Sequence, residues 1–361
     1  MVHWINILGI LFVPLAFLLE YFGGGIKYRF HPLNLMASVS RFIEKFFYKI
    51  SNGIVSGIFF NLLSISIVSI IFSAIFIILL ALLSPLAAVL FSLFILTSFL
   101  SLGGLKSEGK KIYSSLKKEN LDSARENLLS LAGRDRGKLG VPEVSRAVIE
   151  SIAENAGDGI GSVIFYFTAG LIEGLVLFHV IHQKYLFENP VVAAIFSATS
   201  GAVSYKMVNL LDSLTGHRNE RYEKFGKFSA KFDDSMNYLP FRITAYFMLL
   251  SVFILNLFSG FKNKKYNFKE SLLSYKRFKW AHPSPNAAQL ESIMAGALMT
   301  RLGGVNYYED KKSERPVIGF ENYADAGPRG ISSALKIIFS ASVLMAIFYG
   351  IICGVSLMIL N

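Results

Sequence analysis

The sequence predicts an all-α, polytopic integral membrane protein with about 5–7 apolar helices and helical cytoplasmic loops. Two observations predict this class. Hydrophobic residues make up 53% of the 361 positions and charged residues only 17%, which leaves too few polar side chains to cover a soluble protein of this size. Residues 50–105 contain no Asp, Glu, Lys, Arg or His, whereas one bilayer crossing takes about 20 residues.

The apolar stretches locate the expected membrane helices. Residues 50–105 are long enough for two helices, with a turn near Ser84 and Pro85. The other candidate helices are Ile5–Leu19, Gly159–Ile181, Val191–Leu211, Ile243–Phe258 and Ile331–Leu360. Val191–Leu211 departs from a standard span because it carries Lys206, and Ile243–Phe258 is only 16 residues long. Because the N-terminus lacks the basic segment of a cleaved signal peptide, the first stretch is expected to remain as an anchor.

The polar loops hold almost all of the ionisable residues. The loops 20–53, 106–158, 212–238 and 260–330 contain 5, 10, 5 and 12 Lys and Arg residues, against one in the connection around Lys184. The positive-inside rule therefore places these loops in the cytoplasm and the chain in the cell membrane as a multi-pass protein. If every stretch crosses, the last loop falls opposite the other three, so Ile243–Phe258 is expected to be re-entrant or interfacial.

This pattern divides the chain into three regions. Residues 1–105 are N-terminal membrane helices with a basic loop at 20–53, residues 106–330 are a motif-bearing catalytic region with interspersed membrane segments, and residues 331–361 are a C-terminal membrane helix. The net charge of +11 suits anionic lipid headgroups and phosphorylated ligands equally. The single cysteine, Cys353, excludes intramolecular disulfides and cysteine-based zinc sites. Chemistry must therefore rest on His, Arg, Lys and carboxylates.

The first polar block begins at Arg134 and continues into a helix that Pro142 is expected to open. Along this helix a basic residue and three acidic residues recur every four positions and so share one face. They are Arg146, Glu150, Glu154 and Asp158. Such an acidic stripe beside a membrane can bind Mg²⁺ together with phosphate oxygens. The alternative is an exposed helix face stabilised by ion pairs.

The second block contains Asn209 and Asp212, followed by the run Gly216–Tyr222. In this run two arginines flank an amide and a carboxylate, a pattern that suits a phosphate clamp because guanidinium binds phosphate with two hydrogen bonds. The clamp residues are Arg218, Asn219 and Arg221, and the neighbouring His217 is a candidate general base. A helix cap with local ion pairs explains the pattern equally well.

Two further blocks complete the set. Asp233 and Asp234 are adjacent, so we expect at most one of them to point into a site if the segment is helical. The run His282–Ala287 holds Ser284 and Asn286 between and after two prolines, which suits a rigid binding loop better than a flexible linker, with a structural turn as the alternative. Arg301 precedes a Gly pair. The basic and aromatic stretch Lys262–Trp280 is most simply a membrane-surface segment, and we expect no nucleic-acid partner.

Together these blocks resemble the cobalamin-biosynthesis membrane proteins of the CobD/CbiB family, the adenosylcobinamide-phosphate synthases. The resemblance rests on Glu150–Asn155 (ESIAEN) with Asp158-Gly159, on Gly216–Tyr222 (GHRNERY), and on His282–Ala287 (HPSPNA). The chain departs from the family where Glu20 and three glycines replace a Gly-Asp-Pro, although His31-Pro32 is retained. No Walker phosphate loop occurs, so nucleotide would bind in another way.

The resemblance implies an ATP-dependent and Mg²⁺-dependent amide ligation. The substrates would be adenosylcobyric acid, through a side-chain carboxylate, and aminopropanol or its phosphate, and other corrinoid-pathway enzymes are candidate partners. The expected metal ligands are Glu150, Glu154, Asp158 and Asp212. The expected catalytic residues are His217, His282 and Glu154. The expected substrate and phosphate ligands are Arg134, Asn155, Asn209, Arg218, Asn219, Arg221, Ser284, Asn286 and Arg301.

Three other functions compete with ligation. Polytopic chains commonly transport, and a transporter of corrinoids or metal ions would need ionisable residues inside the membrane, where Glu173 and Lys206 fall within candidate spans and His179 and Lys336 lie near span ends. A membrane phosphotransferase would use the same carboxylates and arginines. A scaffold that assembles other corrinoid enzymes is the third alternative.

Overall fold

Helices form almost all of the regular structure in the computed structural model, which describes residues 2–23, 31–129, 131, 139–180, 187–216, 220–259, 265–308 and 311–360. The helices are α1 Val2–Gly23, α2 Pro32–Ile50, α3 Ile54–Leu82, α4 Pro85–Phe99, α5 Leu102–Lys117, α6 Leu121–Leu128, α7 Val141–Ala156, α8 Ser162–Val180, α9 Pro190–Thr215, α10 Lys227–Phe258, α11 Phe268–Phe278, α12 Ala287–Leu298 and α13 Pro328–Leu360. A π-helical turn, η1 Gly157–Gly161, joins α7 to α8, and strands β1 Leu302–Tyr308 and β2 Lys311–Ile318 form one antiparallel hairpin.

Six helical stretches of the described residues are long and apolar enough to cross a membrane. They are 54–82, 85–117, 141–180, 190–215, 227–258 and 328–359. The polytopic all-α class is therefore confirmed, as is the break between two helices at Ser84 and Pro85, where Ser84 caps α4 by accepting a hydrogen bond from the Ala87 backbone N–H at 3.2 Å. The small hairpin is an addition that the sequence did not predict.

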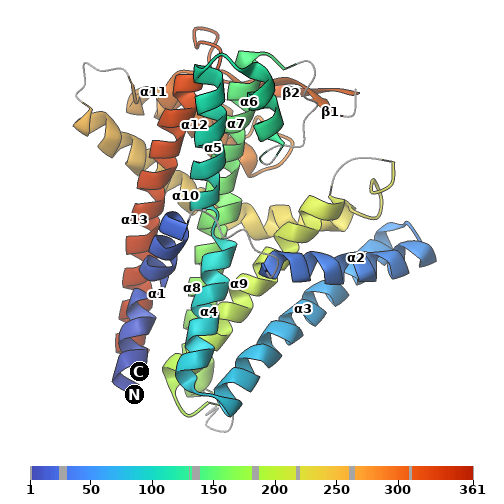
Figure 1. The fold of residues 1–361 in the computed structure, drawn as a ribbon, viewed down its shortest axis with the longest axis vertical. Helices are drawn as coiled ribbons and strands as arrows, with labels where there is room; N and C mark the ends of the chain where they lie inside the picture. Colours follow the sequence, from blue (N-terminus) through green and yellow to red (C-terminus); the bar gives the residue numbers. More distant parts are fainter. Residues whose placement is uncertain are drawn as a thin grey trace.

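The long helices and the shorter elements occupy different parts of the molecule (Figure 1). Helices α4, α8 and α13 follow the long axis of the view, whereas α5–α7, α11, α12 and the hairpin gather at its top. Helices α2 and α10 run across the view instead. The apolar stretch Ile243–Phe258, which was expected to be re-entrant or interfacial, forms the C-terminal half of α10, one helix of 32 residues that continues through Pro240.

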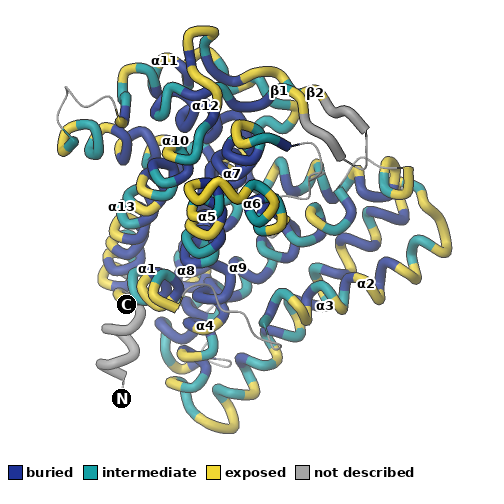
Figure 2. Tube along the Cα trace, turned by 45° about the horizontal axis from the view of Figure 1, so that its top comes forward, coloured by how far each residue is buried: buried dark blue, intermediate teal, exposed yellow. Residues whose placement is uncertain are grey.

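Glycines allow the closest helix packing in the core. Helix α8 lies against α9, and a Cβ at Gly170 would lie 2.5 Å from the Ser197 carbonyl oxygen, while one at Gly201 would lie 2.6 Å from that of Tyr166. In Figure 2, α7 and α9 are largely buried, whereas α2 and α3 carry many exposed residues. In the most apolar 18-residue segment of α3 only 17% is buried, whereas the corresponding segment of α9 is 67% buried. Helix α3 therefore presents most of its surface to its surroundings.

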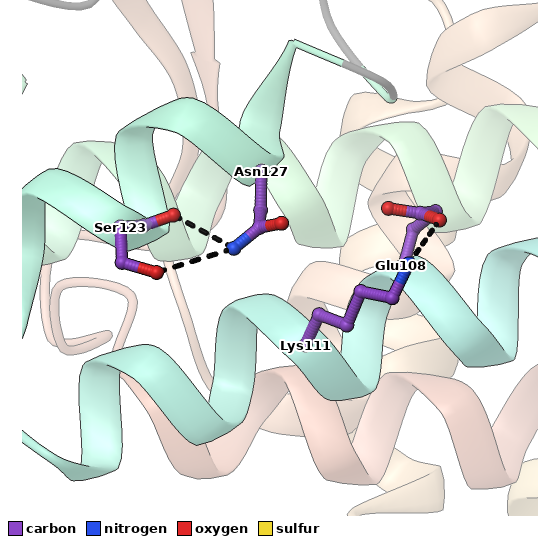
Figure 3. A network of polar contacts seen from close by, with 4 residues as sticks. All are labelled: Glu108, Lys111, Ser123 and Asn127. Carbon is purple, nitrogen blue, oxygen red and sulfur yellow. Dashed lines mark hydrogen bonds and ion pairs between the residues drawn. The ribbon is translucent and has the colours of Figure 1, made fainter.

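The polar end is held to the bundle by local hydrogen bonds. Both carboxylate oxygens of the buried Glu20 accept from the Gly103 backbone N–H, at 2.7 and 2.8 Å, so Glu20 caps the N-terminus of α5. Helix α5 pairs with α6 through the hydroxyls of Ser115 and Ser123, 3.1 Å apart, and within α6 the side-chain amide of Asn127 donates to Ser123 (Figure 3). Figure 3 also shows Lys111 paired with the buried Glu108 at 2.9 Å on α5.

We expect Gly57→Ala to lower thermal stability, because an added Cβ would lie 2.0 Å from the backbone oxygen of Phe225. Relief of that overlap must move α3 away from the segment that follows the GHRNERY run, at a cost of about 1–3 kcal/mol. Gly104→Ala in α5 is the matched control, because nothing lies within 4 Å of its Cβ and a helical Gly→Ala change stabilises by roughly 0.5–1 kcal/mol. Thermal unfolding in detergent measures both, and equal midpoints would contradict the contact.

Candidate active site at the helix ends

A single irregular turn, η1, positions the carboxylate at the centre of the site. The turn inserts Gly157–Gly161 between α7 and α8, and such π-helical insertions are frequent at functional sites. Gly159 and Gly161 allow it to pack closely, because Cβ atoms there would each lie 1.9 Å from a side-chain oxygen, of Ser101 and Thr244 respectively. Asp158 is thereby held against α9 and α10, and its Oδ1 atom is buried without a hydrogen-bond partner among the described residues.

Beside Asp158, a chain of hydrogen bonds links α9 to α10. Lys206 Nζ donates to Asn209 Oδ1 at 2.9 Å, and the Asn209 amide donates to Asp233 Oδ1 at 3.3 Å. Asn237 donates to the other oxygen of Asp233 at 2.9 Å and accepts from the Tyr205 hydroxyl, also at 2.9 Å. Lys206 also lies within electrostatic range of both Asp158 and Asp233, so its ammonium faces two carboxylates. This network holds the ammonium group of Lys206 in place, inside the apolar stretch Val191–Leu211 that the sequence predicted as a membrane helix.

Asp234 connects α10 to the His282–Ala287 loop. Its Oδ1 accepts from the Ser284 hydroxyl at 2.6 Å, and its backbone oxygen accepts from the Asn286 amide at 2.7 Å. The expectation that at most one of the two aspartates would face a site is therefore wrong. Both are engaged, because neighbouring helical residues point about 100° apart and each finds a different partner element.

The His282 ring is fixed within this loop. Its Nδ1 accepts from the Ser284 backbone N–H at 3.0 Å, and its Nε2 is buried without a hydrogen-bond partner among the described residues. Burial and the positive charge of Arg315 lower the pKa of His282 to about 4, against an ordinary value of 6.5. The ring is therefore neutral at physiological pH, with one nitrogen atom available as a ligand or acceptor.

Three of the four predicted metal ligands lie together, and the fourth does not. Asp158 and Asp212 each lie within electrostatic range of Glu154. Glu150 is two helical turns from Asp158, a rise of about 12 Å, and accepts from the Gly303 backbone N–H at 2.7 Å. Among the described residues, no three His, Cys, Asp or Glu side chains form a group that could hold a metal ion by themselves. Any Mg²⁺ would thus need phosphate or water oxygens as well.

Several predicted phosphate ligands contact protein groups. Arg221 pairs with Glu44 of α2 at 2.9 Å and stacks on the Tyr48 ring, 4.9 Å from its centroid. Arg301 pairs with Asp325 at 2.7 Å on the surface. Asn155 donates to the Ser151 carbonyl at 2.9 Å. Four predicted residues lie outside the described part of the chain: Arg134, His217, Arg218 and Asn219.

The structure adds His31, Lys206 and Asn237 to the site, and it engages both Asp233 and Asp234, of which the sequence predicted at most one. His31 caps α2 by accepting from the Leu33 backbone N–H at 3.2 Å, and burial together with the charge of Lys206 lowers its pKa. The retained His31-Pro32 pair therefore lies beside the Lys206 network. The signal for Asp233 and Asp234 was present in the sequence as adjacent carboxylates, whereas Lys206 had no signal except its position inside an apolar run.

The pKa of His282 predicts a pH-dependent stability. Because folding favours the neutral ring, its stabilisation is fully present above pH 6.5 and is lost as the pH falls from 6.5 towards 4. We expect the advantage of the wild type over His282→Gln in thermal unfolding to shrink across this window, since the glutamine cannot titrate. A difference that is constant from pH 7 to 4 would contradict the burial of this ring.

The arrangement defines a class: a polytopic membrane protein whose polar site is assembled from η1, α9, α10 and the His282–Ala287 loop. A family model described as CobD/Cbib protein matches residues 13–338. The chain belongs to the CobD/Cbib family.

Curated relatives carry the name cobalamin biosynthesis protein CobD. The protein from Leptospira interrogans is 32% identical over 338 residues, which cover 93% of this chain and 95% of the relative. The protein from Desulfotalea psychrophila is 31% identical over 339 residues, with 93% and 96% covered. The protein from Clostridium perfringens is 41% identical over 220 residues, 61% of this chain and 58% of the relative. No solved structure matches the chain.

Proposed function

We propose that this protein acts in cobalamin biosynthesis as an ATP-dependent ligase that forms an amide between aminopropanol, or its phosphate, and a side-chain carboxylate of adenosylcobyric acid. The observation that carries the proposal is that two family motifs, at Asp158 and at the His282–Ala287 loop, both meet α10 at Asp233 and Asp234, beside Lys206 of α9. The relatives' shared name supports the pathway.

The carboxylates of the site fit a magnesium ion that is also held by nucleotide phosphates. Mg²⁺ in phosphoryl-transfer sites binds one or two carboxylates, substrate phosphates and water. Asp158 offers a buried oxygen atom that no donor of the described residues reaches, and Glu154 and Asp212 lie close enough to act on the same charge. Bound there, Mg²⁺ would supply charge neutralisation for the transferring phosphate. Arg134 and Arg218 remain the proposed phosphate ligands.

The proposed reaction has two steps. The substrate carboxylate attacks the γ-phosphorus of ATP, which forms an acyl phosphate and releases ADP. The amine nitrogen then attacks the acyl carbon, the C–O bond to phosphate breaks, and inorganic phosphate leaves as the amide forms. Lys206 would stabilise charge on the transferring phosphate.

One proton must leave the amine nitrogen during the second step. The neutral His282 ring can accept a hydrogen bond from that nitrogen at Nε2, but a pKa of about 4 makes it a poor store for the proton. His282 would therefore orient the amine and pass its proton on to the departing phosphate or to water, and His217 is the second candidate for this transfer.

Purified protein in lipid nanodiscs tests the proposal. Incubation with adenosylcobyric acid, radiolabelled aminopropanol phosphate, ATP and Mg²⁺ should yield one amide product and one ADP per turnover. Omission of either ATP or Mg²⁺ should abolish incorporation. Uptake of a corrinoid into sealed vesicles without any ATP turnover would favour a transporter instead, and ADP formation with phosphorylation of the amine substrate would favour a phosphotransferase.

A further inference from the structure

Helix α2 divides its surface into three faces. One face packs on the protein and includes the buried residues Met36, Ser40, Ile43 and Glu44. A second, the apolar stripe, consists of exposed hydrophobic residues at helical spacing: Leu35, Phe42, Phe46 and Ile50. The third, the basic stripe, consists of exposed cationic residues four positions apart: Arg41, Lys45 and Lys49. The two stripes lie side by side on the helix.

The side chains of the apolar stripe are more exposed than is favourable for hydrophobic side chains in contact with water. Phe42 is 78% exposed and Phe46 is 62% exposed, and both line an open groove of about 530 Å³ between α2 and α3. On the α3 side, Leu63 and Ile67 complete a lining that is almost wholly apolar. A contiguous apolar surface rimmed by charge marks an interaction site.

The position of α2 identifies the partner. The helix ends at Ile50, and the strongly apolar span α3 begins at Ile54, so α2 lies where that span meets the edge of the hydrocarbon layer. Figure 1 shows α2 running across the view, whereas α4 and α13 follow its long axis. A helix that lies flat at this level presents one side to acyl chains and the adjacent side to headgroups.

We propose that α2 is an in-plane interfacial helix that binds anionic phospholipid, with acyl chains in the groove between α2 and α3 and phosphate headgroups on the basic stripe. The basic stripe complements anionic headgroups in charge. Each Lys or Arg near an anionic membrane surface contributes a similar attraction, and the three residues stand in one row. The inference concerns the surface of α2 and does not depend on the reaction at the site.

The contacts of α2 extend the proposal to the GHRNERY run. On the protein face, Glu44 accepts from Arg221 at 2.9 Å and from the Tyr222 hydroxyl at 2.7 Å, and the Tyr48 hydroxyl bonds to the Arg221 backbone oxygen at 3.3 Å. A lipid that fixes α2 therefore also fixes the described end of this run. Glu44 and Tyr48 act as positioning residues between the bilayer surface and the site.

Spin labels on single cysteines test the depth of α2. In a Cys353→Ala background the labels are placed at Phe46 and Lys45, with Ile78 of α3 as the hydrocarbon control and Ser114 of α5 as the aqueous control. In nanodiscs, the label at Phe46 should match Ile78 in high collision with oxygen, and the label at Lys45 should fall between the two controls. A Phe46 label that collides with a water-soluble nickel complex as strongly as Ser114 would overturn the proposal, as would one shielded from both quenchers, which would indicate a protein partner or a second copy.

A second measurement tests the charge. Native mass spectrometry compares retention of phosphatidylglycerol over phosphatidylcholine for the wild type and for Arg41→Gln/Lys45→Gln/Lys49→Gln. We expect the preference to fall roughly tenfold in this variant. The control Lys110→Gln/Lys117→Gln/Lys118→Gln removes the same charge from exposed positions of α5 and should leave the preference unchanged. Equal losses in the two variants would reduce the effect to net charge and overturn the proposal.

Discussion

Asp158→Asn is expected to lower ATP-dependent product formation by at least about 100-fold, because loss of one charge-stabilising group at a reacting centre typically costs that much. The asparagine keeps the shape of the side chain but replaces one carboxyl oxygen with an amide nitrogen at a buried position beside Lys206 and Glu154. Single-turnover measurement of ADP and amide formation at saturating ATP and Mg²⁺ gives the effect on chemistry apart from binding.

Glu150→Gln is the matched control for Asp158→Asn. Both carboxylates lie on the same helical stretch, but that of Glu150 accepts from the Gly303 backbone N–H and lies 4.0 Å from Arg146, away from the Asp158 group. The control variant should lose thermal stability near the hairpin and, although Glu150 lies within electrostatic range of His282, lower the turnover rate per folded molecule far less than Asp158→Asn does. If the Glu150 variant loses as much activity as the Asp158 variant, the two carboxylates act in one site, contrary to the distances in the structure.

Lys206→Met is expected to destabilise the folded protein by roughly 3 kcal/mol or more, because removal of one partner from a buried charged group leaves the others uncompensated. Asp158 and Asp233 would then repel each other across α9 and α10 without an intervening cation. Thermal unfolding in nanodiscs measures the loss.

A double variant separates charge from packing at this position. Lys206→Met combined with Asp158→Asn removes one positive and one negative charge, so its stability should exceed that of Lys206→Met alone. If the double variant is as unstable as the sum of the two single changes, the lysine contributes through packing and through its hydrogen bond to Asn209, and the electrostatic account of the network fails.

Hydropathy predicted the membrane class because burial in lipid imposes long runs without charge, and α3, α4 and α13 follow those runs closely. Hydropathy did not predict the full length of α10, because Asp233, Asp234 and Pro240 interrupt the apolar pattern although the backbone continues as one helix. The site lies at this interruption. The spacing of apolar residues does not indicate which carboxylate contacts α9 and which contacts the His282–Ala287 loop.

The site was predicted in part for the same reason. Motif blocks identified Asp158, Asn209, Ser284 and Asn286, because unusual polar residues beside apolar runs stand out by composition. Sequence spacing wrongly suggested that Glu150 would join Asp158, since equal four-residue steps ignore both the rise of the helix and the competing backbone N–H of Gly303. The role of α2 depends on three-dimensional contacts between Glu44 and Arg221, which are far apart along the chain.

The turn η1 also sets how the two halves of its long helical stretch face one another. A π-helical turn amounts to one extra residue in a regular α-helix, and each residue advances the spiral by about 100°. Deletion of a single residue from Gly157–Gly161 would restore regular winding and swing the whole of α7 around its axis relative to α8. One extra residue in this turn thus keeps the carboxylates of α7 in phase with the membrane-spanning helix α8.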